Sequence, residues 1–535
     1  MRMQGWIAMV LLCIAGAAPA AVAGPGGRVF VDGNGNGRFD AGEPGVPGAA
    51  VSNGRALVRT GDDGRYVLPD GGSGIVSLVK PAGWRLPAAA DGLPRSWAPV
   101  PAAPEADRPV DYALLPDPDA RDRDHLDVLV IADPQVKSAT QVDWFERDVL
   151  ATVRAGARAR GAERVADLGL VLGDVVDDVP ALYPAINAAT TALGVPWLHV
   201  PGNHDLDPDT GDAGSLRSYR AVYGPDSHAW EEPEAVFVAL DDVVAAPGDG
   251  RAYVGGLRPD QFAFLEAYLP MVPKDRLLVL AVHVPLFDTA PPGRPETFRA
   301  ADRGRLFALL QRFPRVLVLS GHRHTQRHHR HGAADGWHDE APLHEYSVGA
   351  ASGAFWSGIA DAAGIPDATM ADGTPNGHAR LQVEADGAYR LSWHPARPGT
   401  DDPASTDAMA LHAPKVLRQG AYPAWGVYAN VWMGEDDTRV EFRVDGGAWQ
   451  PMQRVARADP RLLAENARDD AADALRGYDR SPEAEPSTHL WRGALPTQLP
   501  AGEHVVDVRS FDRWQGEQRA STRYRLQAAE PPGPL

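Results

Sequence analysis

The sequence predicts an α/β domain with an all-β region on each side. Between residues 124 and 395, short β-branched and aliphatic runs alternate with stretches of helical periodicity, which is typical of α/β architecture. Before and after this segment, alternating runs are separated by Gly, Pro and Asp turns, as in all-β domains. With Pro/Asp-rich linkers at 115–119 and 395–403, we expect domains at 24–117, 124–395 and 404–530.

The amino-acid composition and the net charge limit the kinds of molecule that the protein is expected to bind. The 535 residues are 44% hydrophobic, enough for several cores, and carry a formal net charge of −19. Proteins that bind DNA or RNA usually present a basic patch to the phosphates, so no nucleic-acid partner is expected. The single cysteine, Cys13, lies in the first 23 residues, and the rest of the chain therefore has no disulfides.

Residues 1–23 are typical of a signal peptide. Arg2 gives a positive start, residues 6–18 are apolar, and Ala21 and Ala23 frame a small-residue cleavage pattern. The apolar run is shorter than the ~20 residues that a spanning helix needs. We therefore expect export to the periplasm or the medium, with no membrane span.

The N-terminal region, predicted to be a β-sandwich, contains a loop at 32–43 that fits the calcium pattern D-x-[DN]-x-[DN]-G-x5-E. The pattern assigns oxygen ligands to Asp32, Asn34, Asn36, Arg38 (through its carbonyl), Asp40 and Glu43. No helical pattern lies on either side of the loop. Bound calcium would therefore stabilise the fold of the domain and would not act as a calcium sensor. A polar Gly/Asn turn without calcium is the alternative.

The remaining elements follow from periodicity. Helical spacing covers 140–158, 260–269 and 302–313 in the middle region. The C-terminal region has alternating runs at 438–444 and 503–508, with a polar, helix-like insertion at about 460–478.

Five strand-like runs of the middle region, at 128–131, 168–172, 197–200, 277–282 and 316–319, are each followed by residues that can bind metal. Open α/β sheets bind ligands outside the carboxyl ends of their strands. Carboxylate, amide and imidazole groups gathered there can hold divalent ions. The residues are Asp133, Gln135, Asp174, Asp177, Asn203, His204, Asp205, His283, His322 and His324.

These residues form five blocks that resemble the calcineurin-like metallophosphoesterase signature, in the order of that family. The blocks are Asp133-x-Gln135, Gly173-Asp174-x-x-Asp177, Gly202-Asn203-His204-Asp205, His283 and Gly321-His322-x-His324. The resemblance covers about half the chain and implies a β-sandwich flanked by helices. The outer β regions also resemble the N- and C-terminal domains of one bacterial subgroup of this family.

The resemblance implies a two-metal hydrolase of phosphate esters. The first ion would be held by Asp133, Gln135, Asp174 and His324, and the second by Asp174, Asn203, His283 and His322. A water bridging the ions would attack phosphorus, and His204 would assist the leaving group. Asp177 or Asp205 would orient the His204 ring.

Two positions depart from the family pattern. Gln135 stands where the family usually has His, which favours manganese, magnesium or iron over zinc at the first site. Asp178 stands where many family phosphatases carry an Arg that contacts phosphate. Arg323, Arg327 and Arg330 are the replacement candidates, because guanidinium matches phosphate geometry.

Two further segments have two interpretations each. The run that contains His328, His329 and His331 could extend the metal cluster, but such tracts are more often solvated loops. The aromatic Gly-rich segment at 353–358 could shape a substrate pocket or pack on the C-terminal region.

Phosphate monoesters and diesters are both compatible with the sequence. The rival to a hydrolase is a non-catalytic surface protein whose β modules bind a glycan or a partner around an inactive core. The complete ligand set argues against that rival, and Gln135 is the feature in its favour.

Overall fold

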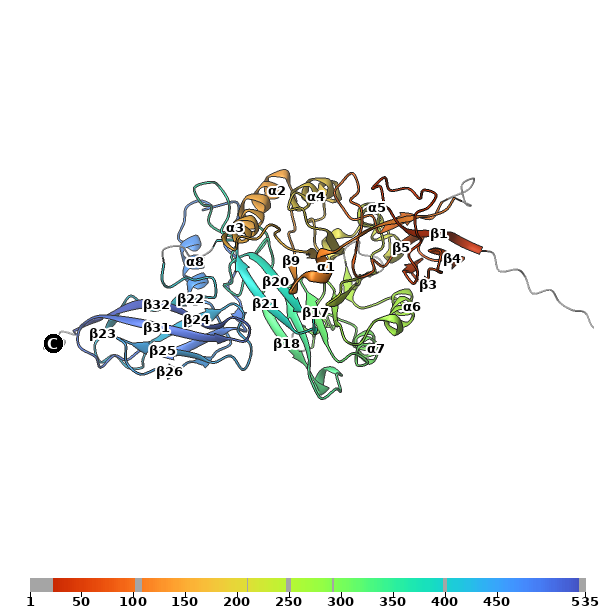
Figure 1. Ribbon diagram of the computed structural model, residues 1–535. Helices are drawn as coiled ribbons and strands as arrows, with labels where there is room; N and C mark the ends of the chain where they lie inside the picture. The colour runs from red at the N-terminus through yellow and green to blue at the C-terminus, as the bar shows by residue number, and fades with distance from the viewer. Residues whose placement is uncertain are drawn as a thin grey trace, which may run out of the picture.

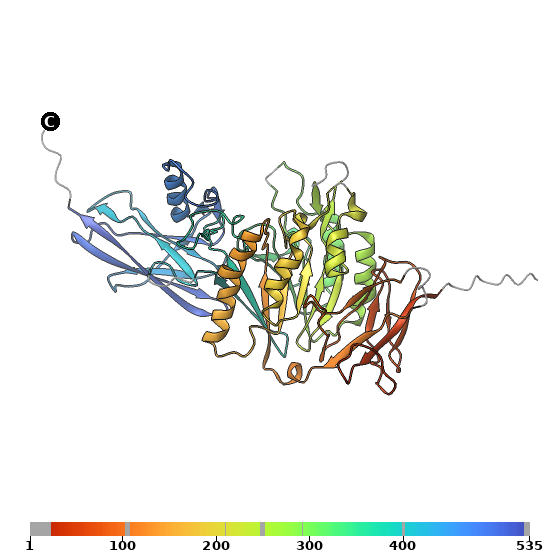
Figure 2. The same cartoon turned by 90° about the horizontal axis from the view of Figure 1, so that it is seen from above.

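The computed structural model describes residues 23–101, 108–208, 210–246, 252–290, 293–397 and 402–528. Residues 1–22, and with them the predicted signal peptide, lie outside the described residues. Figures 1 and 2 show an N-terminal β domain and a C-terminal β domain at opposite ends of a central α/β domain. This arrangement confirms the predicted fold class.

The central domain is built on two sheets that pack face to face. The first has the order β11 (Trp197–Val200), β10 (Leu168–Leu172), β9 (His125–Ile131), β20 (Gly377–Glu384) and β21 (Tyr389–Pro395). The second has the order β12 (His228–Glu231), β13 (Ala235–Ala239), β16 (Leu277–Ala281), β17 (Val316–Ser320), β19 (Leu343–Ser347) and β18 (Arg327–His331). Within them, β9, β10 and β11 are mutually parallel, as are β13, β16, β17 and β19.

Both faces of these strands are buried, and successive residues enter different cores. On β9, Val128 and Val130 belong to the core between the sheets, together with Phe237 and Leu319. Leu129, the residue between the two valines, belongs to the core beneath the helices. Because side chains alternate along a strand, a continuous apolar run satisfies two opposed hydrophobic layers at once.

Helices cover the outer faces of the sandwich (Figure 1). They are α2 (Ala139–Phe145), a π-helical turn (Glu146–Leu150), α3 (Ala151–Ala159), α4 (Tyr183–Thr191), α5 (Arg217–Tyr223), α6 (Pro259–Tyr268) and α7 (Ala300–Leu310). The three helices predicted from periodicity are thus confirmed, the first being α2 to α3 joined through the π turn. None of the helices in the described ranges combines the length and apolarity needed to cross a bilayer.

The outer domains are both sandwiches with their own cores. The N-terminal sheets are β4 (Arg65–Pro69), β1 (Ala23–Val31), β8 (Tyr112–Pro116), β6 (Trp84–Arg85) and β3 (Leu57–Arg59), β2 (Ala50–Ser52), β5 (Ile75–Leu78), β7 (Trp97–Pro99). The C-terminal sheets are β22 (Met409–His412), β24 (Gly426–Val431), β30 (Leu490–Ala494), β27 (Gln453–Arg454) and β23 (Val416–Arg418), β32 (Gly516–Gln527), β31 (Gly502–Asp512), β25 (Val440–Val444), β26 (Gln450–Pro451). The predicted helical insertion is α8 (Pro460–Asp470).

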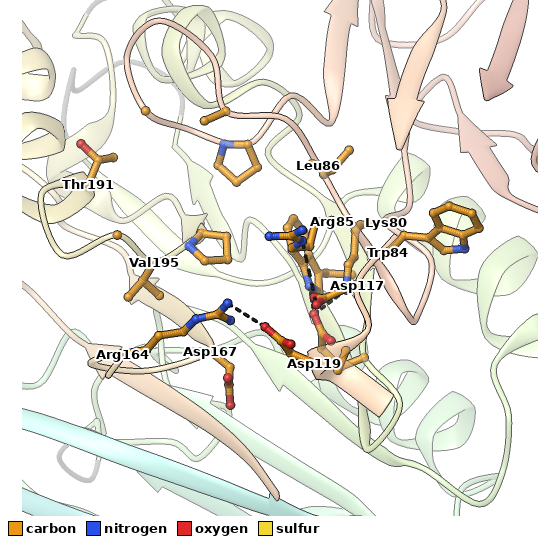
Figure 3. A pocket seen from close by; sticks show the side chains of 18 of the residues that line it. Lys80, Trp84, Arg85, Leu86, Asp117, Asp119, Arg164, Asp167, Thr191 and Val195 are labelled. Atoms are coloured by element: carbon orange, nitrogen blue, oxygen red, sulfur yellow. Dashed lines mark hydrogen bonds and ion pairs between the residues drawn. The ribbon is translucent and has the colours of Figure 1, made fainter. Parts of the chain in front are cut away.

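The N-terminal domain is joined to the central domain by buried charge. Lys80 Nζ lies 2.5 Å from Glu232 Oε1, and both side chains are over nine-tenths buried. Arg123 reaches Glu232 and Glu234 at 2.9 and 2.6 Å. A pocket beside this group is spanned by the pair Arg164–Asp119, as Figure 3 shows. The pocket lies near the amino ends of β9, β10 and β11, the side remote from the predicted metal residues.

The buried pair generates a stability prediction. Glu232→Gln should lower the free energy of unfolding by about 3 kcal/mol, because it leaves the Lys80 ammonium buried without its closest carboxylate. Glu266→Gln is the matched control, since Glu266 and Arg305 form a half-exposed pair worth less than about 1 kcal/mol. Urea unfolding followed by tryptophan fluorescence measures both; equal losses in the two variants would contradict the role given to Lys80.

Candidate metal centre

The seven predicted metal ligands converge beyond the carboxyl ends of five strands. Asp133 and Gln135 follow β9, Asp174 follows β10, and Asn203 begins a 3₁₀ turn (Asn203–Asp205) after β11. From the second sheet, His283 follows β16, and His322 and His324 follow β17. The two sheets therefore supply the two sides of one polar site.

Four of these side chains form a tight group around His283. Its Nε2 atom lies 3.0 Å from Asn203 Oδ1, 3.2 Å from His322 Nδ1 and 3.4 Å from Asp174 Oδ2. The Nδ1 atom of His283 is 2.9 Å from the Leu172 carbonyl and, as the protonated nitrogen, would donate to it. That bond would leave the Nε2 lone pair facing the group, which is the orientation of a metal-binding histidine.

The other three residues lie beside this group. His324 Nε2 is 3.7 Å from Asp133 Oδ1, while His324 Nδ1 is 2.5 Å from the Gly353 carbonyl. Gln135 is 2% exposed, and neither its amide oxygen nor its amide nitrogen has a hydrogen-bond partner. A buried amide without partners is costly unless something else binds it, so these residues fit a metal ion.

Backbone conformation sets where these side chains point. Asp133, Gln135, Asp174, His322 and His324 all have positive φ, between 41° and 71°. This left-handed region is uncommon for non-glycine residues and clusters at functional sites. Gly173 and Gly202 make room at the centre, since added Cβ atoms would lie 2.5 Å from His283 Nδ1 and 2.2 Å from Asp174 Oδ1.

The electrostatics of the centre favour a bound cation. Burial raises the pKa of Asp133, which shares the site with Asp174. Burial lowers the pKa of His322 to about 3 and that of His324 to about 4, so both are neutral and able to donate a lone pair. Burial also opposes protonation of His283, but Asp174 and Asp133 outweigh it and raise its pKa to about 10. A divalent ion would replace that proton as the counter-charge.

His204 lies at the rim of the centre with two carboxylates. Its Nδ1 atom is 3.1 Å from Asp177 Oδ1 and 3.3 Å from Asp178 Oδ1. Burial lowers the pKa of His204, but Asp177, Asp174 and Asp178 together raise it to about 9. The His204 amide donates to Asp174 Oδ1 at 2.8 Å, which ties the ring to the centre.

Asp205, the alternative partner for His204, has a different position. One of its oxygens accepts from the Gly202 and Val175 amides, at 2.9 and 3.2 Å, and the other from the Tyr183 hydroxyl at 3.0 Å. In the structure, therefore, Asp177 contacts His204 and Asp205 does not. Asp205 instead stabilises the loop through its hydrogen bonds to the backbone and to Tyr183. The metal roles of the seven ligands stay predictions.

Three further residues lie around the centre: the sequence reasoning missed two of them, and the third, Phe355, belongs to the segment considered for a substrate pocket. Asp242 accepts from the His283 amide at 3.0 Å, and the Tyr253 hydroxyl is 3.3 Å from His322 Nε2. Phe355, 48% exposed, stacks on His324 with ring centroids 4.5 Å apart. Asp242 follows β13, so the rule that chemistry lies beyond strand ends could have found it. Phe355 places one residue of the 353–358 segment at the site.

The three candidate arginines for phosphate differ in their surroundings. The guanidinium of Arg330 is 2.6 Å from Glu435 of the C-terminal domain, and that of Arg327 stacks 4.4 Å from the Phe287 ring centroid. Arg323 is exposed, and its charge acts on the pKa of both Tyr253 and His322. Of the three, Arg323 is the one available next to the centre.

The predicted calcium loop is an open turn after β1. Asp32 Oδ1 accepts from the Gly35 amide at 2.7 Å, and Asp32 Oδ2 from the Gly37 amide at 2.8 Å. Asp40 Oδ2 accepts from the side-chain amides of Asn34 and Asn36, both at 2.7 Å. Asn36 Oδ1 accepts from the Arg38 amide at 2.7 Å, and Glu43 accepts from Gly33 and Asp40 amides, both at 2.9 Å. Within the loop, Asn34, Asn36 and Glu43 thus bind Asp40, while Asp32 binds backbone amides.

Two family models match the chain, and both describe parts of calcineurin-like phosphoesterases. Residues 126–326 match the family model described as calcineurin-like phosphoesterase, and residues 345–517 match the one described as the C terminal of calcineurin-like phosphoesterase. No curated protein matches the chain.

Among solved structures, the chain is similar to purple acid phosphatase PPD1 from yellow lupin (Lupinus luteus) seeds, with 14% identity, a TM-score of 0.36 and 52% of each chain covered. It thus spans about half the length of that protein. It is also similar to the protein TT1561 of Thermus thermophilus (13% identity, TM-score 0.29, 51% of this chain and 100% of that one). The phosphopantetheinyl hydrolase PptH from Mycobacterium tuberculosis has 16% identity, a TM-score of 0.27, and coverages of 42% and 90%.

Proposed function

The chain belongs to the calcineurin-like phosphoesterases, and from that premise we propose that it hydrolyses phosphate esters with two divalent metal ions. The observation that carries the proposal is the convergence of seven ligand-type side chains, with the buried amide of Gln135 left without a partner. An inactive relic would have no reason to keep a buried polar group unsatisfied at this cost.

Two ions held by these ligands would act as Lewis acids on the phosphoryl oxygens and lower the pKa of a water. Asp174 would serve both ions, since it belongs to the His283 group and its charge also acts on Asp133. The neutral rings of His322 and His324 would each offer the nitrogen that faces the centre. We propose manganese, magnesium or iron at the first site, because the amide of Gln135 is a harder ligand than imidazole.

His204 would supply the proton for the leaving oxygen. Nδ1 faces Asp177 and Asp178, so Nε2 is the atom left for substrate. The neighbouring carboxylates keep the ring protonated near neutral pH, as a general acid requires. Asp177 is then a positioning residue.

Arg323 and Phe355 border the proposed reaction site. Arg323 could take the place of the arginine absent at position 178 and bind a phosphoryl oxygen. The exposed ring of Phe355 offers an apolar surface to the alcohol part of an ester. Both features support a small ester as substrate and fit monoesters and diesters alike.

We also propose that residues 1–23 direct export and are removed. The support is the sequence pattern alone, with its positive start, apolar run and cleavage site. The absence of cysteine beyond Cys13 is compatible with an oxidising compartment.

We further propose that the loop at 32–43 binds one calcium ion as a structural staple. The fit to the full pattern, with Asp32, Asp40 and Glu43 on one short loop, supports it. A cation would also offset the repulsion among three carboxylates on one short loop.

The hydrolase proposal predicts that two substitutions act differently. His204→Asn should lower kcat on p-nitrophenyl phosphate or bis(p-nitrophenyl) phosphate by about 10²–10⁴, with bound metal unchanged. Asp174→Asn should remove the two metal ions of this centre together with the activity. The assay uses metal-free protein resupplied with Mn²⁺, Mg²⁺, Fe²⁺ or Zn²⁺, with elemental analysis of each variant.

The control for this assay is His338→Asn, which alters an exposed histidine and should leave turnover intact. Full activity of Asp174→Asn would refute the two-metal assignment. Absence of turnover with every metal, together with no tight metal binding, would favour the surface-protein alternative. The ratio of the two substrates assigns monoester or diester preference.

The calcium proposal predicts metal-dependent stability. Calcium at 100 times its Kd should stabilise the N-terminal domain by about 2.7 kcal/mol, because the ion binds only the folded loop. Asp32→Asn should abolish the effect, and Asp62→Asn, in a different turn of the same domain, should preserve it. Thermal melting with calcium and with a chelator measures this; identical curves for the wild type would argue against a calcium site.

The export proposal predicts a processed N-terminus. Full-length protein expressed with its own leader in a Gram-negative host should appear outside the cytoplasm and begin at Gly24. N-terminal sequencing of the fractionated protein checks it. Retention of residues 1–23 on cytoplasmic protein would show the proposal to be wrong.

A further inference from the structure

A second cluster of metal-ligand side chains lies away from the seven residues of the metal centre. It consists of His329 and His331 on β18 and Asp335 in the 3₁₀ turn that follows (Ala333–Asp335). One nitrogen from each histidine and one oxygen of Asp335 all lie within 4.8 Å of one another. His329 Nε2 is 3.5 Å and His331 Nδ1 is 4.0 Å from Asp335 Oδ2.

The strand explains why both rings reach the same point. Residues two apart on a strand project from the same face, so His329 and His331 are neighbours, with ring centroids 4.5 Å apart. His328 and Arg330 project from the other face, toward Trp514 and Glu435 of the C-terminal domain. The His/Arg run is therefore a paired strand, and the expectation of a solvated loop was wrong.

Among the described residues, the facing atoms of the two rings form no hydrogen bond of good geometry, and both lie within 4.0 Å of Asp335 Oδ2. His329 Nε2 and His331 Nδ1 are both buried and unsatisfied, and the His331 side chain is fully buried. On its opposite edge, His331 Nε2 is 2.6 Å from Glu345 Oε2. If Nε2 carries the proton and donates to this carboxylate, Nδ1 is left with a lone pair that faces the carboxylate of Asp335. The lone pair of His331 Nδ1 and the carboxylate of Asp335 would then face each other as two acceptors, an arrangement that a cation between them would stabilise.

Glu345 completes the arrangement as a support for His331. It is fully buried, and its Oε1 atom accepts from the Leu286 amide at 2.9 Å and from Ser320 Oγ at 2.8 Å. A carboxylate that holds the outer nitrogen of a histidine is the usual support of a metal-binding ring. Asp335 is likewise fixed, since its Oδ2 accepts from the Gly332 amide at 3.0 Å.

We propose that His329, His331 and Asp335 bind a third divalent metal ion, zinc by the chemistry of the donor set. Two imidazoles and one carboxylate with an open fourth position form a common zinc site. Ligand atoms ~2.0–2.1 Å from a tetrahedral zinc lie roughly 3.3–3.5 Å apart. The 3.5 Å distance from His329 to Asp335 matches this spacing, and the 4.0 Å distance from His331 to Asp335 would have to shorten on binding. His329 and Asp335 are a fifth to a quarter exposed, which leaves a path for the ion and for a water ligand.

The site would be structural. Its histidines pack against Phe287 and Phe307, with ring centroids 4.8 and 5.1 Å away, so apolar side chains cover part of the site. Through Glu345 it is linked to Leu286 and Ser320, which flank the loops that carry His283 and His322. Zinc here would fix the supports of those loops.

Zinc stoichiometry tests the proposal on the full-length protein. After equilibration with Zn²⁺ and dialysis, elemental analysis should give one zinc per chain fewer for His329→Ala and for Asp335→Asn than for the wild type. His338→Ala, an exposed histidine three residues beyond Asp335, is the matched control and should retain the wild-type content. Circular dichroism should confirm that each variant is folded.

The Asp174→Asn variant separates this site from the two-metal centre. It should still bind one zinc, and that zinc should disappear when His329→Ala is added. A zinc content that is the same with and without His329→Ala, in either background, would overturn the third site. The result does not depend on hydrolysis, so loss of the proposed function would leave this test intact.

Discussion

The metal centre depends on a backbone constraint at the ends of the parallel strands. Asp133, Gln135, Asp174, His322 and His324 all hold left-handed conformations that cost ~1–3 kcal/mol each. Such conformations persist only when the surroundings leave the chain no alternative. The strands before them are buried on both faces, between the inter-sheet core and the helix-covered core, which fixes where each turn must start. The packing of the two cores therefore stabilises the fold and also holds these residues in their strained backbone conformations.

Buried charge is the second constraint on this architecture. Asp133, Asp174 and Asp242 are at most 2% exposed and lie within one site. Backbone amides bind part of this charge, as at Asp133, which accepts twice from the His322 amide. The remainder falls to His283 or to bound cations. Each of the three carboxylates accepts from at least one backbone amide, which lowers the cost of burying them together.

Local patterns in the sequence were sufficient to predict the strands and the residues beyond them. The runs at 168–172 and 197–200 are observed as β10 and β11 with the same bounds, because each apolar run ends at a glycine or proline that favours a turn. Contacts between distant residues could not be predicted. Lys80 and Glu232 are 152 positions apart, and no pattern in the sequence around either residue indicates that the two are in contact. The strand β18 was not predicted because all its residues are polar. Hydrophobic periodicity, which identified the other strands, cannot detect such a strand.

The placement of the two outer domains bears on how the protein avoids self-association. The six-stranded sheet ends in β12 on one side and β18 on the other, and an open edge of this kind is a template for pairing with another chain. The N-terminal domain occupies the first edge, where the Glu231 amide donates to the Lys80 carbonyl at 2.9 Å. The C-terminal domain contacts the second edge strand through side chains, at Arg330–Glu435 and His328–Trp514. The N-terminal domain thus covers the backbone edge of β12, and removing that domain would expose an edge that can seed aggregation.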